Sequence, residues 1–461
     1  MTAAACIDDE IPLRDYQTSA IDACRREMAQ NRRRVCLVLP TGAGKTRTAA
    51  SVVQSALRKR TPVLWLAHRS ELVEQACQTL EGFGIQVGVV AASSGRRPMP
   101  DVPCQVASIQ TLVAREAHRP RAGLIVWDEC HHASEAAECW SSLLDSYPNV
   151  PLLGLTATPE RGDGAGLAPL FNGLVVGATV RELTMAGHLV PCAVVRPDRM
   201  LQPGEIGEDP VDAYLRHGER RQAILFARSV EEALGYAAAL NAREVRAECV
   251  TAVTPRADRE AALELYRRGT VRVLTNVYVL TEGTDLPAAS VCMLARGAGS
   301  AGIYLQMVGR VLRPAPGKTE ALLWDGRGVS HLHGYPEDER LYSLDGRGIR
   351  LVAAPACKVC SAPLPSGYPC EKCGYQPTQA EAAETTIVGC RMERVDPAVR
   401  FSAFRQQNDG ERWQKLLFWI RKAEELGHKP TSVRFKWRHV YGEDLPAAQL
   451  ARAVMEVRRG G

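Results

Sequence analysis

The sequence lacks an uninterrupted apolar run of about 18 residues, the length that a membrane-spanning helix requires. Residues 1–10, MTAAACIDDE, carry acidic side chains and no apolar stretch of the kind that a secretory leader needs. We therefore expect a protein that is neither secreted nor membrane-spanning and that resides in the cytoplasm.

Short repeats, a collagen-like pattern and coiled-coil heptads are also absent, and neither sign of charge dominates. The net charge of +5 is mild, so it is compatible with an anionic partner without establishing one. With 461 residues, of which 46% are apolar and 24% charged, the chain has an ordinary globular composition. This length predicts about three domains.

Cysteine, in contrast, is abundant, with 15 residues. Most of these, such as Cys36, Cys77 and Cys292, are scattered through apolar or helical contexts without a pairing pattern. They indicate buried thiols in a reducing compartment. The remaining four form a separate cluster, which is considered below.

Short apolar runs alternate with helical stretches through roughly the first 330 residues. The predicted strands are Val35–Leu39, Val63–Ala67, Val106–Ile109, Leu124–Trp127, Leu152–Thr156, Ala223–Ala227, Val271–Thr275 and Ser290–Leu294. Such alternation favours parallel sheets covered by helices, and the count fits two sheets. Prolines and glycines between residues 191 and 221 predict a linker between them.

The segment LPTGAGKT, Leu39 to Thr46, organises the first of these sheets. Gly42 and Gly44 let backbone N–H groups face a phosphate, Lys45 reaches the β- and γ-phosphates, and Thr46 can ligate Mg²⁺. The expected cradle is Thr41, Gly42, Ala43, Gly44, Lys45 and Thr46. The strict pattern has Gly where Leu39 stands, and the alternative is a glycine turn between a strand and a helix.

DECHH, Asp128 to His132, follows an apolar strand, which places Asp128 and Glu129 at its carboxyl end. Open α/β sheets bind ligands at that edge. Asp128 would hold Mg²⁺ and Glu129 would polarise the attacking water, the alternative being a helix N-cap. For His131 and His132 we prefer polar contacts beside the nucleotide to a metal site, because no further ligands are spaced around them.

The order of these motifs resembles that of superfamily-2 helicases. The resemblance is carried by LRDYQ (Leu13–Gln17), LPTGAGKT, LAHRSEL (Leu66–Leu72), ASIQTL (Ala107–Leu112), DECHH and GLTATPE (Gly154–Glu160). It looks closest to the branch of the XPB-like and RadD-like DNA helicases and their phage relatives, and it covers roughly residues 10–330. It implies two RecA-like domains and a bacterial or phage-encoded protein. Leu39 is ordinary for that branch.

The resemblance also implies roles that composition does not show. Arg14 and Gln17 would recognise adenine, and Thr156 and Thr158 would couple nucleotide state to the nucleic acid. The implied nucleic-acid contacts are His68, Arg69, Ser108, Thr111 and Thr281, while Gly283 and Asp285 would lie beside the nucleotide.

YLQMVGRVLR contains Gln306, Arg310 and Arg313 at helical spacing. Two arginines on one helix face are commonly solvated charge. On the functional interpretation this helix faces the nucleotide across the cleft, so that both guanidinium groups meet the γ-phosphate. Hydrolysis would then require the cleft to close.

Cys357, Cys360, Cys370 and Cys373 form C-x2-C-x9-C-x2-C, a spacing typical of a structural Zn²⁺ site. A redox pair is the alternative, but the intervening prolines and the absence of a βαβ context argue against it. So short a segment cannot bury a core, so the metal would supply its folding energy.

The tail from Arg391 is basic and rich in aromatic residues, with helices expected at Glu411–Leu426 and Thr431–Tyr441. Its aromatic residues pack a small core or stack on bases, and both interpretations stay open. The candidate phosphate contacts are Lys429, Arg434, Lys436 and Arg438.

The sequence therefore predicts an α/β protein with two RecA-like parallel-sheet domains in tandem, a small zinc-ribbon-like module and a mainly helical C-terminal domain. The expected boundaries are 1–190, a linker at 191–221, 222–350, 355–376 and 377–461. We expect an ATP-dependent DNA helicase or translocase that uses ATP, Mg²⁺ and Zn²⁺ and acts in DNA repair, recombination or replication.

Its partner would be single-stranded, duplex or forked DNA, with RNA the less favoured substrate, and repair or replication proteins are expected partners. Two alternatives remain. One is an RNA helicase or RNA-stimulated ATPase, and the other is a motor or binding subunit of a restriction or repair complex.

Overall fold

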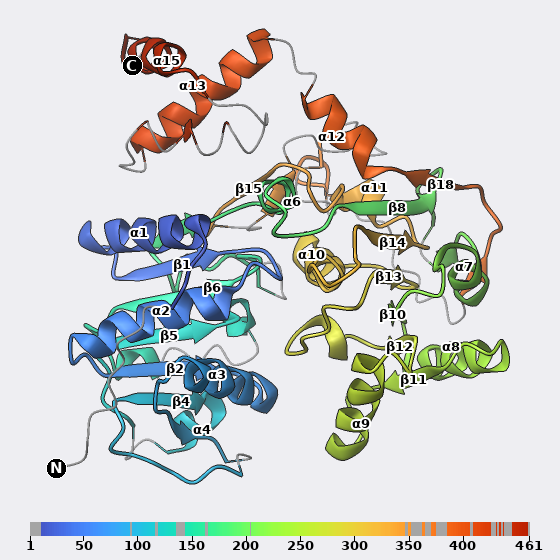
Figure 1. Ribbon diagram of the computed structural model, residues 1–461, viewed down its shortest axis with the longest axis horizontal. Helices are drawn as coiled ribbons and strands as arrows, with labels where there is room; N and C mark the ends of the chain where they lie inside the picture. Colours follow the sequence, from blue (N-terminus) through green and yellow to red (C-terminus); the bar gives the residue numbers. More distant parts are fainter. Residues whose placement is uncertain are drawn as a thin grey trace.

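Figure 1 shows the computed structural model of the protein. The structure describes residues 11–92, 95–115, 119–134, 143–161, 165–202, 204–345, 349–351, 362–364, 370–374, 385–405, 409–425, 430, 433–434, 437 and 445–459. Two sheets lie side by side in this view, the first in blue and teal and the second in green and yellow.

The first sheet has seven strands in the order β3-β4-β2-β5-β6-β1-β7, and all its pairings are parallel. The strands are β1 (Arg34–Val38), β2 (Val63–Ala67), β3 (Gly88–Val90), β4 (Cys104–Ser108), β5 (Leu124–Asp128), β6 (Leu152–Thr156) and β7 (Gly173–Val176). The connecting helices are α1 (Asp15–Ala29), α2 (Lys45–Arg58), α3 (Ser70–Gly82), α4 (Ile109–Ala114), η2 (Cys130–Ser134) and α6 (Val180–Met185). Strands β2, β5 and β6 are buried along their whole length, as expected when helices cover both faces of a parallel sheet.

The second sheet has the order β11-β12-β10-β13-β14-β8-β18, parallel except for the antiparallel edge strand β18. Its strands are β8 (Cys192–Pro197), β10 (Ala223–Phe226), β11 (Ala247–Val250), β12 (Val273–Asn276), β13 (Val291–Leu294), β14 (Ala321–Asp325) and β18 (Met392–Val395). Its helices are α7 (Pro210–His217), α8 (Val230–Ala242), α9 (Arg256–Arg267), η3 (Val279–Thr281), α10 (Ala301–Gly309) and α11 (Ser330–His333). Two small sheets accompany it, β15 (Arg340–Tyr342) with β16 (Ile349–Leu351) and β9 (Glu205–Ile206) with β17 (Thr386–Ile387).

The prediction of two parallel-sheet domains in tandem is confirmed by this topology. Each of the eight strands predicted from the sequence overlaps a strand of the structure. The strands that the sequence prediction missed are mostly short or lie toward the sheet edges, such as β3, β7 and β11. Their few apolar residues give no alternation that a periodicity can detect.

The expected linker at 191–221 is wrong. Strand β8 pairs with β14 inside the second sheet, from Ala321↔Cys192 to Trp324↔Val195, and α7 begins at Pro210 with Asp209 as its N-cap. Of the prolines that suggested a break, Pro197 ends this strand and Pro210 occupies the first position of this helix, where proline is tolerated. Strand β18, expected in the C-terminal domain, also belongs to the second sheet.

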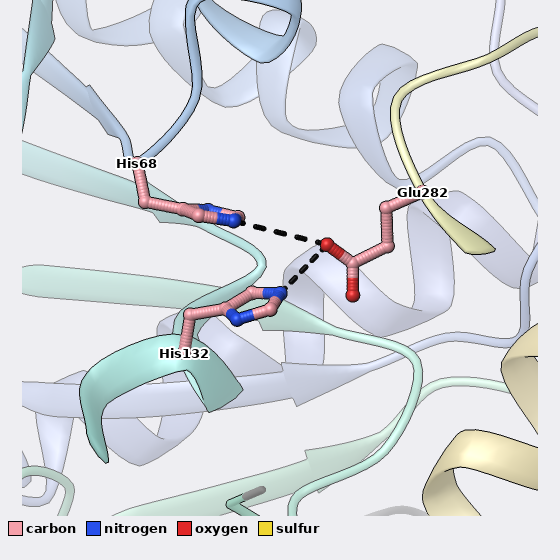
Figure 2. A group of neighbouring side chains, drawn as sticks. All are labelled: His68, His132 and Glu282. Atoms are coloured by element: carbon pink, nitrogen blue, oxygen red, sulfur yellow. Dashed lines mark hydrogen bonds and ion pairs between the residues drawn. The ribbon is translucent and has the colours of Figure 1, made fainter. Parts of the chain in front are cut away.

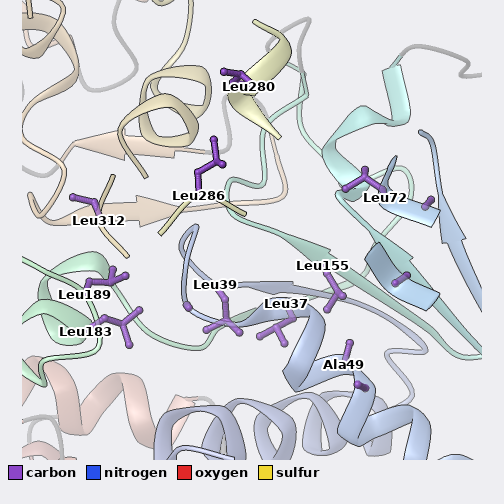
Figure 3. Close-up of a cluster of buried hydrophobic side chains, with 14 of the residues drawn as sticks. Leu37, Leu39, Ala49, Leu72, Leu155, Leu183, Leu189, Leu280, Leu286 and Leu312 are labelled. Carbon is purple, nitrogen blue, oxygen red and sulfur yellow. The ribbon is translucent and has the colours of Figure 1, made fainter. Parts of the chain in front are cut away.

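One apolar cluster runs through both sheets and the segment between them (Figure 3). It joins Leu37 and Leu39 of the first sheet to Leu286 and Leu312 of the second. Leu39, the residue that departs from the strict phosphate-loop pattern, is fully buried, and a Cβ on Gly177 would lie 2.7 Å from its Cδ2. Leu39 is therefore a core residue, at the position where the strict phosphate-loop pattern has glycine.

The C-terminal part of the described chain contains α12 (Pro397–Arg405), α13 (Asp409–Glu425) and α15 (Ala447–Arg459). The helix expected at Glu411–Leu426 coincides largely with α13, whereas most of the one expected at Thr431–Tyr441 lies outside the described residues. Helices α13 and α15 pack around Leu416, Ile420 and Ala453 in a core separate from both sheets. Among the described residues no helix is both long and apolar enough to cross a membrane.

Candidate active site between the two sheets

The phosphate loop connects β1 to α2 at the carboxyl edge of the first sheet. Gly42 and Gly44 have φ angles of +86° and +77°, a conformation that side chains with a Cβ rarely adopt. The hydroxyl of buried Tyr16 donates to the carbonyl of Ala43 at 2.7 Å, and Gln17 Nε2 donates to the same oxygen at 3.2 Å. Helix α1 therefore holds the loop in shape.

Gln17, expected to read adenine together with Arg14, lies directly against this loop. Its Oε1 accepts from the backbone N–H of Arg14 at 3.0 Å, and a Cβ on Gly44 would lie 2.7 Å from its Nε2. The structure thus brings Arg14 and Gln17 to the loop. Their contact with adenine stays a prediction.

Lys45 lies close to the two carboxylates of DECHH, Asp128 and Glu129. Lys45 Nζ lies 3.4 Å from Glu129 Oε1, and the backbone N–H of Glu129 donates to Asp128 Oδ1 at 3.1 Å. Burial, followed by the neighbouring charge of Glu129, raises the pKa of Asp128 to about 7. A cation brought close to Asp128 would favour its charged form.

These residues fit MgATP. The two glycines leave the backbone cradle free of Cβ atoms, Lys45 supplies a positive charge, and Thr46 stands in the first turn of α2. Asp128 supplies an oxygen ligand of the kind that Mg²⁺ prefers, and Glu129 Oε2 is buried without a hydrogen-bond partner among the described residues.

Helix α10 of the second sheet packs directly on the phosphate loop. A Cβ on Gly309 would lie 2.6 Å from Thr41 Cβ, and a Cβ on Gly42 would lie 2.9 Å from Arg313 Cγ. Residues at position 42 and position 313, far apart in sequence, therefore lie against each other. Arg313 Nη1 also donates to Asp285 Oδ1, so Asp285 pairs with this arginine.

The expectation that Arg310 and Arg313 share one face of a helix is wrong, because α10 ends at Gly309 with Arg310 as its C-cap, and Arg313 lies beyond the helix. Arg310 lies in the same contact with the phosphate loop and is almost fully buried. Its Nη1 donates to the carbonyl of Thr284 at 2.9 Å, while its Nε has no hydrogen-bond partner within the described residues. Burial, with a further contribution from Arg313, lowers the pKa of Arg310 to about 10. A buried guanidinium with an unused donor is suited to an anionic group in the cleft.

His131 connects the two sheets through Gln306. Gln306 Nε2 lies 3.0 Å from His131 Nε2 and 3.4 Å from Thr158 Oγ1. His131 Nδ1 in turn lies 3.0 Å from Thr156 Oγ1, which also accepts from the backbone N–H of Thr158. This chain of contacts joins α10 to the TATP segment, as the expected coupling role of Thr156 and Thr158 requires.

Glu282 of the second sheet lies beside three histidines of the first, His68, His131 and His132. Figure 2 shows Glu282 with His68 and His132. His132 Nε2 bonds Glu282 Oε2 at 2.6 Å, and His131 Nε2 bonds Glu282 Oε1 at 3.0 Å. Burial alone would raise the pKa of Glu282, but the hydrogen bonds from His131 and His132 hold it well below its usual range. Its carboxylate is therefore charged.

His68, expected beside the nucleic acid, lies in this group instead. Its ring stacks on that of His132 at 3.8 Å, and burial lowers its pKa to about 3. With a side chain only 5% exposed, it cannot reach a nucleic acid in this closed arrangement. The resemblance implied the nucleic-acid contact, and a single polar residue after a strand gives no sign of burial.

Of the other residues expected to contact nucleic acid, some are exposed and some are buried. Arg69 is exposed and lines a cavity of about 580 Å³ between the sheets, together with Arg256 and Arg259 of α9. Thr111 and Thr281 are buried and already bonded, Thr111 to the N–H of Ala92 and Thr281 to the carbonyl of Tyr278.

Ser108 is half-buried and donates to Gln110. Gly283 has a φ of +72°, and a Cβ on it would lie 3.8 Å from Leu72 across the cleft. Nucleic-acid contact by these residues stays a prediction.

Several residues of the site were missed from the sequence. Tyr16 stood within the LRDYQ segment and Gly309 within the Q-x-x-G-R-x-x-R pattern, so both signals were present. Glu282 gave none, because its partners His131 and His132 lie about 150 residues earlier in the chain. Only the folded chain brings them together.

Two protein families match the two sheets. Residues 10–161 match the family described as type III restriction enzyme, res subunit, and residues 208–315 match the helicase conserved C-terminal domain. The matched segments contain the phosphate loop, DECHH, and the two arginines that follow α10, Arg310 and Arg313.

Curated relatives bear out the branch. A 51.5 kDa protein of a Lactococcus phage is 27% identical over 77% of this chain and 81% of its own length. The DNA 3′-5′ translocase XPB2 of Sulfurisphaera tokodaii is 27% identical over 67% of this chain and 80% of its own. The chain belongs to the superfamily-2 helicases, in their XPB-like branch. It is therefore a helicase-class, nucleic-acid-dependent ATPase.

This helicase is also 27% identical to the putative ATP-dependent helicase IRC3 of Saccharomyces cerevisiae. The similarity covers 69% of this chain but only 52% of the length of IRC3. Among solved structures, a fragment of a putative HsdR subunit of a type I restriction enzyme from Vibrio vulnificus shares its fold. The TM-score is 0.56 at 22% identity, and the likeness covers 74% of this chain and 72% of that one.

The predicted cysteine site stays a prediction. Cys357 and Cys360 lie outside the described residues, while Cys370 is buried and Cys373 is exposed. Of the four candidate phosphate contacts in the tail, Lys429, Lys436 and Arg438 also lie outside the described residues, and Arg434 is exposed.

Proposed function

We propose that this helicase is an ATP-driven DNA helicase or translocase, in which ATP hydrolysis between the two sheets drives movement along DNA. The observation that carries the proposal is the contact between α10 and the phosphate loop. Gly309 lies against Thr41, and the Arg313 side chain lies against Gly42. Residues of both sheets thereby converge on one nucleotide site.

The chain's own residues have distinct tasks in this proposal. Bound MgATP supplies the phosphoryl group that is transferred to water. Lys45 and the loop amides bind and orient the phosphates, Asp128 holds the metal, and Glu129 accepts the proton of the attacking water. Arg310 and Arg313 neutralise the charge that develops on the γ-phosphate, a contribution of roughly 10³–10⁵ in rate in such enzymes.

Movement follows from the distribution of these groups over two sheets. Because Lys45 belongs to the first sheet and the arginines to the second, the site is complete only when the cleft is closed. A chain of contacts connects the nucleotide site to the segments beside the cavity that Arg69 lines. It consists of Gln306, His131, Thr156 and Thr158. The arginines Arg69, Arg256 and Arg259 are our proposed phosphate-backbone contacts.

DNA is the proposed track because the relatives named as acting on nucleic acid include a DNA translocase. The test is an ATPase assay of the full chain with single-stranded DNA, duplex DNA and RNA. Stimulation by DNA is expected, whereas greater stimulation by RNA would favour an RNA helicase, and no stimulation by any nucleic acid would refute the proposal. Strand displacement on 3′-tailed, 5′-tailed and forked DNA then separates unwinding from translocation.

A second candidate is the motor subunit of a restriction or repair complex. The match of residues 10–161 to a restriction-enzyme subunit family favours it, and so does the fold shared with an HsdR fragment. The chemistry of the cleft would be the same, with cleavage supplied by a partner. Sizing the protein with and without DNA, alone and in a cell extract, would detect a stable complex. We also propose that the protein acts in DNA repair, recombination or replication.

A further inference from the structure

Three side chains from separate segments point their ligand atoms at one spot in the cleft (Figure 2). His68 follows β2, His132 belongs to η2, and Glu282 follows η3 of the second sheet. One ligand atom from each lies within 4.8 Å of the other two. Two imidazoles and one carboxylate are a ligand set typical of Zn²⁺ and other divalent transition ions.

His68 has no other use for its ring nitrogens. Both Nδ1 and Nε2 are buried and make no hydrogen bond with the described residues, and the nearest carboxylate oxygen, Glu282 Oε2, is 3.8 Å from Nε2. Leaving buried polar atoms without a partner is unfavourable, because burial removes their hydrogen bonds to water and nothing replaces them. A side chain that is 95% buried and aimed at two other ligand atoms is better explained by a ligand between them.

The surroundings hold the three ligands in place. His131 bonds Glu282 Oε1 at 3.0 Å, which leaves Oε2 facing His68 and His132, and His131 is itself fixed by Thr156. Gln110 Nε2 donates to the backbone carbonyl of His68 at 3.0 Å. Such outer contacts orient ligands in metal sites.

We propose that His68 Nε2, His132 Nε2 and Glu282 Oε2 bind one Zn²⁺ ion between the two sheets, with a fourth position open to water. Zn–N and Zn–O bonds of about 2.0–2.2 Å place ligand atoms roughly 3.3–3.5 Å apart. The His68–Glu282 separation of 3.8 Å and the His132–Glu282 separation of 2.6 Å each require a shift of less than about 1 Å. Both imidazoles then carry their proton on Nδ1.

The ion would join the sheets, because His68 and His132 belong to the first and Glu282 to the second. The ligand set is complete only while the cleft is closed. Bound Zn²⁺ therefore holds the two sheets together and slows any cycle that requires them to separate. Binding itself requires neither nucleotide nor nucleic acid, so it can be tested even if the proposed function is wrong.

The test measures zinc bound per chain after the full-length protein is equilibrated with Zn²⁺ alone and freed of excess metal. His68→Phe keeps a ring against His132 and removes the nitrogens, whereas Glu282→Gln keeps the volume but removes the charge and one of the two acceptor oxygens. Each variant is expected to bind one equivalent fewer than the wild type. Equal zinc content in all three proteins would overturn the proposal, and Glu282→Gln tests it even if His68→Phe misfolds.

A matched control separates metal ligation from simple loss of an ion pair across the cleft. Glu71 Oε1 pairs with Arg259 Nη1 at 3.0 Å, also between the two sheets. Glu71→Gln breaks this pair and removes none of the three ligands, so its zinc content should equal that of the wild type. Loss of the same equivalent in Glu71→Gln would show that the ion needs only closure, and would contradict the assignment of ligands.

Co²⁺ distinguishes this site from the predicted cysteine cluster. Co²⁺ bound by two imidazoles and a carboxylate gives weak ligand-field bands without the sulfur charge-transfer absorption of a thiolate site. The ligand-field component should disappear in His68→Phe and Glu282→Gln and persist in Glu71→Gln. Titration spectra that show thiolate bands alone would refute the site.

Discussion

The side chain of Arg313 lies against Gly42, so that a Cβ on this glycine would approach Arg313 Cγ to 2.9 Å and Leu189 Cδ2 to 3.2 Å. The contact joins the segment that follows α10 of the second sheet to the phosphate loop of the first. It requires a residue without a side chain at a φ of +86°. The two sheets can therefore approach this closely in part because position 42 has no side chain.

Gly42→Ala should weaken ATP turnover by hindering this contact and straining the loop, at a cost of about 1–3 kcal/mol. Gly82→Ala is the matched control, because Gly82 has no positive φ and a Cβ there meets nothing within 4 Å. Steady-state ATPase rates and urea unfolding of both variants provide the measurement. Equal activity of the two variants would show that α10 need not approach the loop.

Lys45→Ala should abolish ATP turnover while leaving the fold intact, because Lys45 is the cation of the loop and its ion pair with Glu129, at 3.4 Å, involves the ammonium group at the end of the side chain. Circular dichroism measures whether the fold is intact, and an ATPase assay measures turnover. Lys59→Ala, at the other end of α2, should retain activity. ATPase activity retained in Lys45→Ala would show that the loop is not the phosphate site.

Arg310→Ala should still bind ATP but lose hydrolysis by roughly 10³–10⁵, the range seen for arginines that stabilise phosphoryl transfer. The exposed Arg268 provides a control for loss of a positive charge. Fluorescent-nucleotide binding and single-turnover hydrolysis separate the two effects. If binding disappeared together with hydrolysis, Arg310 would be a structural residue held by the carbonyl of Thr284.

Leu39→Ala should lower the free energy of unfolding by about 2–5 kcal/mol, since Leu39 is fully buried against Ala20 and Gly177. ATP affinity of the folded protein should change little. Urea unfolding and nucleotide titration are the measurements. Weaker ATP binding without loss of stability would place Leu39 in the phosphate site, contrary to its burial.

Lys318 should make stability depend on pH. Burial lowers its pKa to about 7, with Arg313 and Arg221 adding to the effect. Between pH 7 and 10.5 the unfolded chain holds a proton that the folded chain has released, so stability rises with pH by at most about 1.4 kcal/mol per unit.

The measurement compares wild type with Lys318→Met from pH 6.5 to about 9.5. Lys318 also donates to the carbonyls of Pro287 and Ala289, so the variant differs from wild type by an offset that does not depend on pH. The difference in unfolding free energy should therefore change across this range in favour of wild type. A constant difference would mean that Lys318 titrates normally.

Much of the fold could be predicted because its signals are local. Runs such as Val63–Ala67 and Leu152–Leu155 are apolar throughout, and a glycine-rich loop after such a run marks both a strand end and a ligand site. The segment 191–221 was misjudged for the same reason. Proline and glycine punctuate the chain locally, and only pairing with β14 shows that β8 is a strand.

The sequence by itself determined the alternating strands, the phosphate loop, the Asp128–Glu129 pair and the helix that precedes Arg310, because each depends on neighbours within a few residues. Tertiary structure alone decided that His68 is buried, that Glu282 joins His131 and His132, and that Arg313 rests on Gly42. These contacts join residues 150 or more positions apart or depend on burial between two sheets. No spacing along the chain encodes which parts of two sheets will face each other.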